Sequence, residues 1–389
     1  MTSRYALVVL ATTLVPNVAA CAQTPAARPD VLPRSTVTAA PTPPALKDVF
    51  RKAFRVGVAL NPRQFEQADP ASAALIKYHF NTISPENVMK WEVIHPEPGR
   101  YDLAPADRYV GFGERNGMFV IGHTLVWHSQ VPKWVFEDES GKPLTRDALL
   151  ARMRDHIQTV VGRYRGRVGG WDVVNEALNE DGTLRESPWY RIIGPDYIAK
   201  AFQYAHEADP AAELYYNDYS MERAEKRAGG VRLVKSLLAQ RIPIAAVGMQ
   251  DHLKMDWPTA AQEDSTISAF AALGVRVNIT ELDVDVLPQA TRSRGADVSL
   301  RAAADPSLDP YAKGLPDAMQ QALARRYAEI FGVFLRHQDV IERVTFWGLA
   351  DGDSWLNGWP IPGRTNYPLL FDRQGRPKPA FQALTALVP

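Results

Sequence analysis

Apolar runs alternate with amphipathic stretches along most of the chain, and this pattern predicts repeated strand–helix units. Eight short runs predict strands, at residues 56–60, 82–85, 119–125, 170–174, 213–216, 246–249, 276–280 and 343–347. Between them apolar residues recur every three or four positions, which predicts helices, for example at residues 146–164, 222–240 and 315–336. Strands this short and this apolar are typical of a parallel sheet that is covered on both faces.

Eight such alternations favour a closed barrel over an open doubly wound sheet. The first predicted strand continues into Asn61-Pro62 without a glycine-rich phosphate-binding motif, which argues against a nucleotide-binding fold. We therefore predict an α/β fold, a (β/α)8 TIM barrel, as a single catalytic domain at residues 47–389. We expect the stretch 286–310 to form an elaborated loop over the active face.

The first 46 residues have a different character. Residues 1–21 contain one basic residue, Arg4, then an apolar run and small residues, which is typical of a cleaved export signal and too short to span a bilayer stably. The tetrapeptide Val18-Ala19-Ala20-Cys21 resembles a bacterial lipobox, in which the cysteine is lipidated; the alternative is ordinary cleavage nearby. Residues 22–46 are rich in Pro, Ala and Thr and predict an extended tether. We expect export, as a lipoprotein of the outer membrane or periplasm or as a secreted protein.

The composition excludes several classes of binding partner. Lysine plus arginine and aspartate plus glutamate each total 44, so no broad field exists to attract nucleic acid or anionic lipid. We expect no nucleic-acid partner, membrane contact only through a lipid on Cys21, and a monomer. Cys21 is the only cysteine, which excludes an intrachain disulfide, and no motif implies a cofactor or a metal. Nine tryptophans supply rigid rings suited to the apolar faces of sugars.

Polar and aromatic residues follow the predicted strands where each one ends. Active sites of such barrels lie at the carboxyl ends of the strands. Buried polar side chains cost free energy unless they are satisfied, so their concentration at one rim predicts a polar cleft with aromatic walls. In chain order these residues are Glu86, Asn87, Lys90, His123, Trp127, His128, Asn175, Glu176, Asn217, Asp218, Tyr219, Gln250, Asp251, His252, Glu281, Asp283, Trp347 and Trp355.

Two of these residues, Glu176 and Glu281, end strongly apolar runs and would face each other across the mouth of the barrel. A carboxyl pair of this kind can hydrolyse a glycosidic bond, with one member as general acid. A separation of about 5 to 5.5 Å would retain the anomeric configuration, and about 6.5 to 9.5 Å would invert it. The residues alone leave this choice open, and either glutamate taken singly is also compatible with an ion pair or a helix cap.

The strings that end in Glu176 and Glu281, together with residues 122–128 (GHTLVWH), resemble glycoside hydrolase family 10. The similarity extends from about residue 47 to 388 and includes the segments 309–311 (DPY), 314–316 (GLP) and 376–381 (RPKPAF). Members of this family are retaining endo-β-1,4-xylanases with a (β/α)8 fold. The resemblance therefore implies hydrolysis of xylan and xylo-oligosaccharides without a cofactor.

The resemblance also implies roles for individual residues. Glu281 would be the nucleophile and Glu176 the acid/base, with Asn175 bonded to the 2-hydroxyl of the reacting sugar. His252, partnered by Asp283, would orient the nucleophile. The implied substrate-binding residues are Glu86, Asn87, Lys90, His123, Trp127, Tyr219, Gln250, Trp347 and Trp355, with Tyr219 on the leaving-group side.

Other interpretations of these residues stay open at this point. The three tryptophans could be ordinary core, the His252–Asp283 pair could be purely structural, and His123 with His128 could be a metal pair, although no carboxylate completes a recognisable ligand set. Asp251 is unexpected between two site residues; we expect it to point away from the cleft because neighbours in a strand alternate faces. The alternative functions are another retaining β-1,4-glycanase, acting on glucan or mannan, and a non-catalytic glycan-binding lipoprotein.

Overall fold

The computed structural model describes residues 43–290 and 295–388. The predicted export signal, Cys21 and nearly all of the tether lie outside the described residues. Ala45 and Leu46, which the sequence assigns to the tether, are buried, and Leu46 begins the first helix, α1 (Leu46–Val49). The folded part therefore begins slightly before the predicted residue 47.

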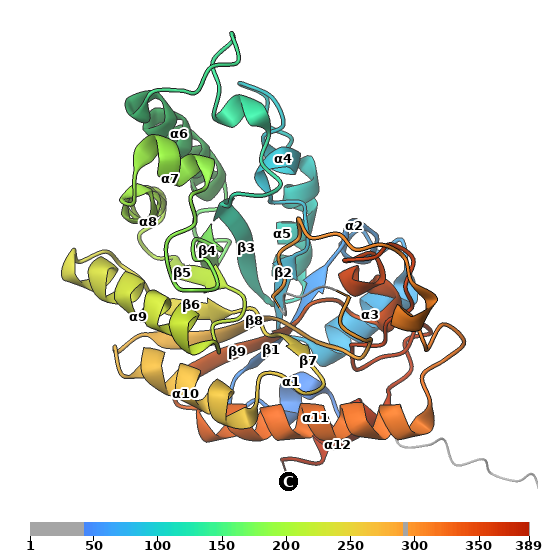
Figure 1. Cartoon of the computed structure of the whole chain (residues 1–389). Helices are drawn as coiled ribbons and strands as arrows, with labels where there is room; N and C mark the ends of the chain where they lie inside the picture. Colours follow the sequence, from blue (N-terminus) through green and yellow to red (C-terminus); the bar gives the residue numbers. More distant parts are fainter. Residues whose placement is uncertain (1–42, 291–294, 389) are drawn as a thin grey trace, which may run out of the picture. The chain divides into compact units, whose positions relative to one another are not determined.

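Eight parallel strands close into a barrel (Figure 1). They are β1 (Arg55–Leu60), β2 (Thr82–Pro85), β3 (Phe119–Val126), β4 (Gly170–Asn175), β5 (Glu213–Asp218), β6 (Ala246–Met249), β8 (Arg276–Asp285) and β9 (Ile341–Phe346). Each strand from β1 to β6 pairs with the next, β9 pairs with β1 and β8, and the pairing of β6 with β8 closes the ring. The predicted (β/α)8 barrel is confirmed, with all eight strands in the predicted places.

A ninth strand, β7 (His252–Lys254), was not expected from the sequence. It pairs only with the distal part of β8, which places His252 opposite Asp283 and Lys254 opposite Asp285. Gln250 and Asp251 separate β7 from β6, and Asp251 has a left-handed backbone, with φ of +58°. This turn lets the chain leave the barrel wall and still continue beside β8.

Helices lie between the strands in sequence and surround them in space (Figure 1). The longer ones are α3 (Pro70–His79), α5 (Ala104–Arg115), α6 (Arg146–Arg163), α8 (Tyr197–Ala208), α9 (Ala224–Ala239), α10 (Ala260–Ala271) and α11 (Asp317–Arg336). Short ones are α2 (Pro62–Phe65), α4 (Trp91–Ile94), α7 (Pro188–Ile193) and α12 (Pro379–Thr385), with 3-10 turns η1 (Lys133–Val135), η2 (Pro306–Leu308), η3 (Asp351–Asp353) and η4 (Trp355–Asn357).

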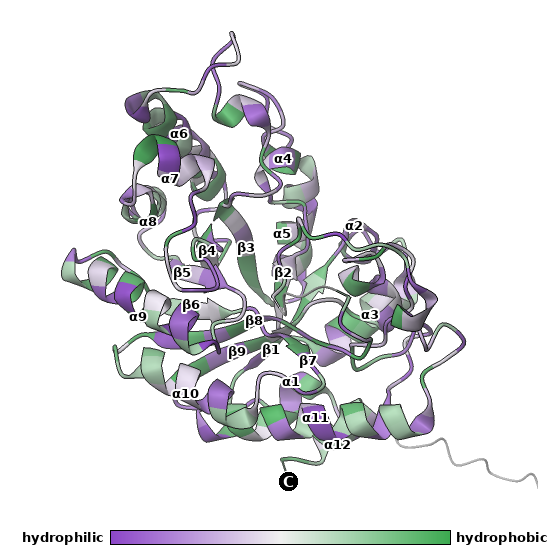
Figure 2. Ribbon diagram, in the orientation of Figure 1, coloured by the Kyte–Doolittle hydropathy of each residue, from purple (hydrophilic) through white to green (hydrophobic). Residues whose placement is uncertain are grey.

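Amphipathic helices account for the layering. Figure 2 shows apolar and polar residues alternating along α11. Its apolar residues Tyr327, Ile330, Phe331 and Phe334 are fully buried. Its exposed charged residues are Asp317, Arg325, Glu329 and Arg336, while Arg326 is buried. Within residues 43–290 and 295–388, no helix is both long enough and apolar enough to cross a bilayer.

Side chains are closely packed on both sides of the barrel wall. Trp171 of β4 is fully buried beside Gly122 of β3, and a Cβ at Gly122 would lie 2.1 Å from the Trp171 ring. His123, the next residue of β3, lines the cavity, so Gly122 and its register partner Trp171 face the helix side of the barrel wall, and glycine at this position lets the indole pack against that wall. On the inner side Ile121, Tyr215 and Ala246 form a separate buried cluster, which supports the polar groups at the carboxyl ends of the strands.

Candidate active site

A cavity of about 210 Å³ opens at the carboxyl ends of the barrel strands. It is lined by Glu86, Asn87, Lys90, His123, Trp127, Gln130, Asn175, Glu176, Gln250, His252, Glu281, Ala296, Val298, Trp347 and Trp355. Both predicted catalytic glutamates are in this set, together with ten of the other residues that the sequence assigned to the site. Of the predicted set, Asp283 and Tyr219 are not part of the lining.

Glu281, on β8, is held as an anion by donors on both oxygens. Asn217 Nδ2 donates to Oε1 at 2.8 Å, and His252 Nε2 lies 3.2 Å from Oε2. Burial raises the pKa of the Glu281 carboxyl, but the hydrogen bond from His252 and the charge of His123 outweigh it, so the pKa lies below its ordinary value. This carboxylate is therefore available as a nucleophile at neutral and mildly acidic pH.

A chain of hydrogen bonds behind Glu281 fixes its histidine partner. Nδ1 of His252 lies 3.1 Å from Oδ1 of Asp283, and Nε1 of Trp355 donates to Oδ2 of Asp283 at 2.8 Å. Burial lowers the pKa of His252, but the Asp283 carboxylate and the two hydrogen bonds raise it to about 10. The imidazolium can donate from both nitrogens, one to Asp283 and one to Glu281.

Glu176 follows β4 in a left-handed backbone conformation, with φ of +56°, and only 3% of the residue is exposed. Burial raises the pKa of its carboxyl to about 7, and the charges of Asp218 and, less strongly, Glu281 act in the same direction. N–H donors from Gln250, at 3.0 Å from Oε1, and from Trp127, at 2.8 Å from Oε2, oppose this rise. Glu176 thus holds a proton in mildly acidic solution while Glu281 does not.

Three side-chain amides connect the two glutamates. Asn217 Nδ2, which donates to Glu281, also donates to Oδ1 of Asn175 at 2.9 Å. Gln250 Nε2 lies 3.3 Å from the same Asn175 oxygen and 3.0 Å from Glu176. Because each amide is fixed by its neighbours, the two carboxyl groups have a set orientation relative to each other.

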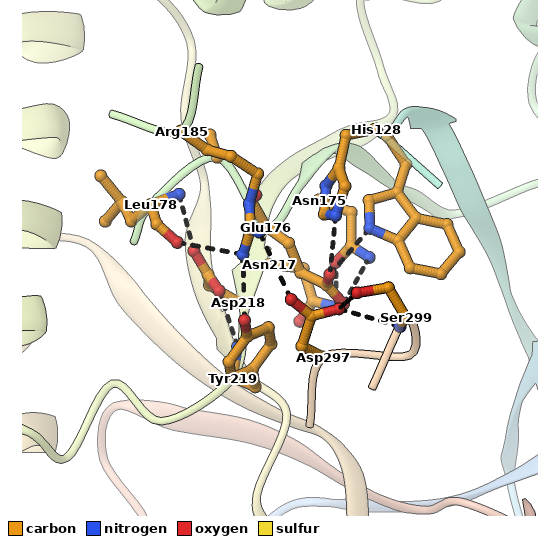
Figure 3. Close-up of polar contacts among 12 residues, drawn as sticks. His128, Asn175, Glu176, Leu178, Arg185, Asn217, Asp218, Tyr219, Asp297 and Ser299 are labelled. Carbon is orange, nitrogen blue, oxygen red and sulfur yellow. Dashed lines mark hydrogen bonds and ion pairs between the residues drawn. The ribbon is translucent and has the colours of Figure 1, made fainter. Parts of the chain in front are cut away.

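The segment around Asp297 lies next to Glu176 (Figure 3). Nη1 of Arg185 is 3.7 Å from Oδ2 of Asp297, and Nε of Arg185 donates to the backbone oxygen of Glu176 at 3.1 Å. His128 Nε2 is 4.0 Å from Oε2 of Glu176, but burial lowers the pKa of His128 to about 4, so this histidine is neutral at neutral pH. The neighbouring Ala296 and Val298 line the cavity, in agreement with the expected loop over the active face.

Tyr219 lies outside the cavity lining and is 3% exposed. Its hydroxyl accepts a hydrogen bond from Nη2 of Arg185 at 2.9 Å (Figure 3). The Lys226 ammonium lies 3.6 Å from the centroid of its ring. In the structure Tyr219 therefore supports Arg185, and a contact with the leaving-group sugar stays a prediction.

Polar side chains from the loops after β2 and β3 form one wall. Lys90 Nζ donates to Asn87 at 3.0 Å and to Gln130 at 2.7 Å, and it lies 5.1 Å from the centroid of the Trp127 ring. Glu86 lies beside them, and burial raises the pKa of its carboxyl. This wall offers both donors and acceptors to sugar hydroxyls.

Aromatic rings also line the cavity. The ring of Trp355 stacks on that of Trp359, with centroids 4.7 Å apart, and its nitrogen is fixed by Asp283. Trp347 meets the His123 ring edge-on at 5.5 Å, and His123 Nδ1 is 2.9 Å from Asp172. The two tryptophans line the cavity as rigid surfaces, so they do more than fill the core.

The whole length of the folded part matches a known family. Residues 45–387 fit the family described as glycosyl hydrolase family 10. The chain belongs to glycosyl hydrolase family 10. It is 49% identical over 344 residues to endo-1,4-beta-xylanase A of Xylanibacter ruminicola, with 88% of this chain and 93% of the relative covered.

Two solved structures agree with this assignment. A GH10 endoxylanase retrieved from a sugarcane soil metagenome is 50% identical, with a TM-score of 0.86, 88% of this chain and all of that chain covered. A mutant in complex with xylotriose is 35% identical, with a TM-score of 0.78 and coverage of 88% of this chain and 99% of that chain.

Several residues of the site were not selected from the sequence. Asn217 was noted at the end of a strand but given no role, although its position carried the same signal as the others. The sequence did not predict that Gln130 lines the cavity, because the direction of its side chain depends on a left-handed backbone with φ of +45°. Loops contribute Ala296, Val298 and Arg185. The type of a residue does not predict the path that its loop takes, so nothing in the sequence indicated that these three reach the site.

Asp251 points away from the cavity, as expected, but for a different reason. The positive φ of Asp251 turns the chain at this point, so strand alternation does not apply. Its side chain lies instead with those of Glu222 and Glu263. It therefore has no contact with the substrate cavity.

Proposed function

We propose that Glu281 attacks the anomeric carbon of a β-1,4-linked xylose while Glu176 protonates the departing glycosidic oxygen. The first step leaves the sugar bonded to Glu281 in the α configuration and releases the leaving-group chain. In the second step Glu176, now ionised, takes a proton from water, and the water oxygen displaces Glu281 to restore the β configuration. The enzyme is a retaining endo-β-1,4-xylanase, and these two residues are the proposed carriers of its chemistry.

The opposite displacement of the two pKa values is the observation that carries this proposal. One carboxyl in the cavity is kept ionised by His252 and Asn217, and the other has a pKa of about 7 and holds its proton. Two glutamates whose surroundings separate their pKa values in this way are suited to nucleophile and acid.

The same arrangement supports the change of role between the two steps. Once Glu281 forms an ester, its negative charge is lost, and one of the influences that raise the pKa of Glu176 is removed. Glu176 then releases its proton more readily and acts as a base toward water. Asn175 is placed between the two carboxyls, where it could bond the 2-hydroxyl of the reacting sugar.

Azide rescue of two variants tests the assignment. With an aryl β-xylobioside that carries a good leaving group, Glu281→Ala should give the α-glycosyl azide and Glu176→Ala the β-glycosyl azide. The exposed neighbour Glu186 provides the control, since Glu186→Ala should form no azide adduct and keep wild-type activity. Wild-type turnover in both alanine variants, without azide products, would contradict the proposed roles.

Xylan is preferred over glucan because the aromatic wall is fixed. Xylose lacks the hydroxymethyl group of glucose, and Trp355 cannot easily withdraw, since it is stacked on Trp359 and bonded to Asp283. Initial rates of reducing-sugar release from xylan and from carboxymethyl-cellulose measure this preference. Faster cleavage of the cellulose derivative would contradict it, and binding of xylan without release would indicate a non-catalytic protein.

We further propose that the chain is exported and carries a lipid on Cys21. The support is the sequence of residues 1–21 and the Pro-rich segment that follows, which would give the enzyme reach from a membrane surface. Intact mass of the mature protein from a bacterial host tests this, with Cys21→Ala as control. A mature N-terminus beyond residue 21 without lipid would contradict it. Analytical ultracentrifugation of the catalytic part tests the expected monomer.

A further inference from the structure

Three carboxyl side chains meet in a second cluster, outside the residues that line the substrate cavity. Glu222 is in the turn between β5 and α9, Asp251 is between β6 and β7, and Glu263 is near the start of α10. One oxygen from each lies within 4.8 Å of the other two. The residues are only 2%, 1% and 0% exposed, so the cluster is closed off from bulk water.

Five of the six carboxylate oxygens in the cluster lack hydrogen-bond donors. Both oxygens of Asp251, both oxygens of Glu263 and Oε1 of Glu222 are buried and accept no hydrogen bond from an N–H or O–H group in the part of the chain that the structure describes. Buried polar groups are otherwise almost always satisfied, and a buried carboxylate costs more than a neutral group. These oxygens therefore need a partner that the side chains around them do not provide.

The two cationic side chains whose charges act on the cluster, Lys226 and Arg326, have their contacts elsewhere. Lys226 Nζ is 2.9 Å from Asp218 and 3.8 Å from Glu180. Arg326 donates to Glu329 at 2.8 Å and to the backbone oxygen of Lys254 at 3.2 Å. Their charges act on the cluster only from a distance, and neither forms an ion pair within it.

We propose that Glu222, Asp251 and Glu263 bind one Ca²⁺ ion. Carboxylate oxygens are the ligands that Ca²⁺ prefers, at about 2.3 to 2.6 Å, so ligands on opposite sides of the ion are about 4.6 to 5.2 Å apart. The three oxygens lie within 4.8 Å of one another, so one ion can reach all of them. Mg²⁺ gives up its waters reluctantly and demands near-ideal octahedral geometry, so it is the poorer match for a closed set of carboxylates. Three carboxylates can supply up to six oxygens if each is bidentate.

The ion would join three segments that are distant in sequence. Asp251 lies between Gln250 and His252, which contact Glu176 and Glu281 respectively. Bound Ca²⁺ would therefore hold the turn between β6 and β7, including its positive φ, against α10 and the start of α9. The effect on catalysis is indirect, through the stability of this turn.

Calcium content and thermal stability test the proposal on the full catalytic part. After treatment with EGTA and gel filtration, we expect the protein to take up one Ca²⁺ per chain in isothermal titration calorimetry. We expect a rise in Tm of about 5 °C when Ca²⁺ is a hundredfold above its Kd, and a smaller rise with Mg²⁺. These measurements do not depend on xylanase activity. The Ca²⁺ proposal and the proposed function can therefore be refuted independently of each other.

Two variants localise the site. Asp251→Asn and Glu222→Gln keep the shape of the side chain but remove a negative charge, and each should weaken Ca²⁺ binding at least tenfold and remove the rise in Tm. Glu225→Gln, an exposed change in the first turn of α9, should leave both unchanged. If a variant does not fold, the wild-type titration alone still decides between binding and no binding.

Shared protons are the competing explanation. Burial raises the pKa of all three carboxyls, and their mutual repulsion acts in the same direction for Asp251 and Glu263, so a cluster without metal would hold protons at neutral pH. In that case wild-type Tm would not respond to Ca²⁺ or EGTA, and calorimetry would show no binding. Either result would overturn the proposal, as would equal Ca²⁺ binding by the Asp251→Asn and Glu222→Gln variants.

Discussion

Replacing Glu176 with Gln should remove the alkaline limb of the pH profile. In the wild type, burial raises the pKa of this carboxyl from 4.5 to about 7. The acid must be protonated to act, so its contribution is present below this pKa and is lost as pH rises through it. At pH 6 such a group is about 90% protonated, whereas an ordinary carboxyl would be about 3% protonated, a roughly thirtyfold difference in competent enzyme.

The assay compares kcat/KM on two substrates between pH 5.5 and 9. On xylo-oligosaccharides, wild-type kcat/KM should fall about tenfold per pH unit above pH 7 and about a hundredfold by pH 9. Glu176→Gln should lose about 10² to 10⁴ in rate on the same substrate. On a dinitrophenyl xylobioside, whose leaving group needs no proton, the variant should retain kcat/KM and show no limb near pH 7.

Glu186→Gln serves as the matched control, because Glu186 is an exposed glutamate on the same loop after β4. It should reproduce the wild-type profile on both substrates. A limb near pH 7 that persists in Glu176→Gln would mean that another group titrates there, and the assignment of the acid would be wrong. An unchanged rate on xylo-oligosaccharides would lead to the same conclusion.

Three further changes follow from particular contacts. Asn217→Ala removes a donor to the nucleophile, a hydrogen bond to charge worth about 1.5–3 kcal/mol, so kcat/KM should fall about 10- to 100-fold and the acidic limb should move to higher pH; an unmoved limb would contradict this. Trp127→Phe removes a donor that favours the ionised acid/base glutamate, so the alkaline limb should move above pH 7, and a downward move would refute the reasoning. Gly122→Ala places a methyl group against the Trp171 ring and should cost about 1–3 kcal/mol of unfolding free energy by thermal or urea denaturation. Gly162→Ala, in the last turn of α6 where a Cβ meets open space, is its control and should stabilise by up to about 1 kcal/mol; equal effects of the two would contradict the packing argument.

The barrel and its two glutamates could be predicted because their signals are local. Each barrel strand is a short apolar run, and each glutamate ends one, so topology alone brings them to a common rim. The residues that tune these glutamates were harder to assign. Asn217 was visible at a strand end, but its role depends on reaching both Asn175 and Glu281, which only the closed barrel brings together.

The other features that the sequence did not predict share one physical cause. β7 is three residues long and follows a left-handed residue, so its sequence does not differ from that of a loop. The ion pair between Arg185 and Asp297 joins two loops more than a hundred residues apart. Such contacts depend on the path of a loop through space, which a pattern of apolar and polar letters along one segment does not specify.

The pairing of β7 with β8 constrains how this enzyme can be recombined with its relatives. The register sets His252 opposite Asp283 and Lys254 opposite Asp285, so two cross-strand ion pairs connect β7 with β8. A chimera whose crossover point falls between residues 254 and 283 would take the two partners of each pair from different parents. Fragments exchanged among such enzymes should therefore carry both strands from one donor, so that Glu281 keeps the histidine that matches it.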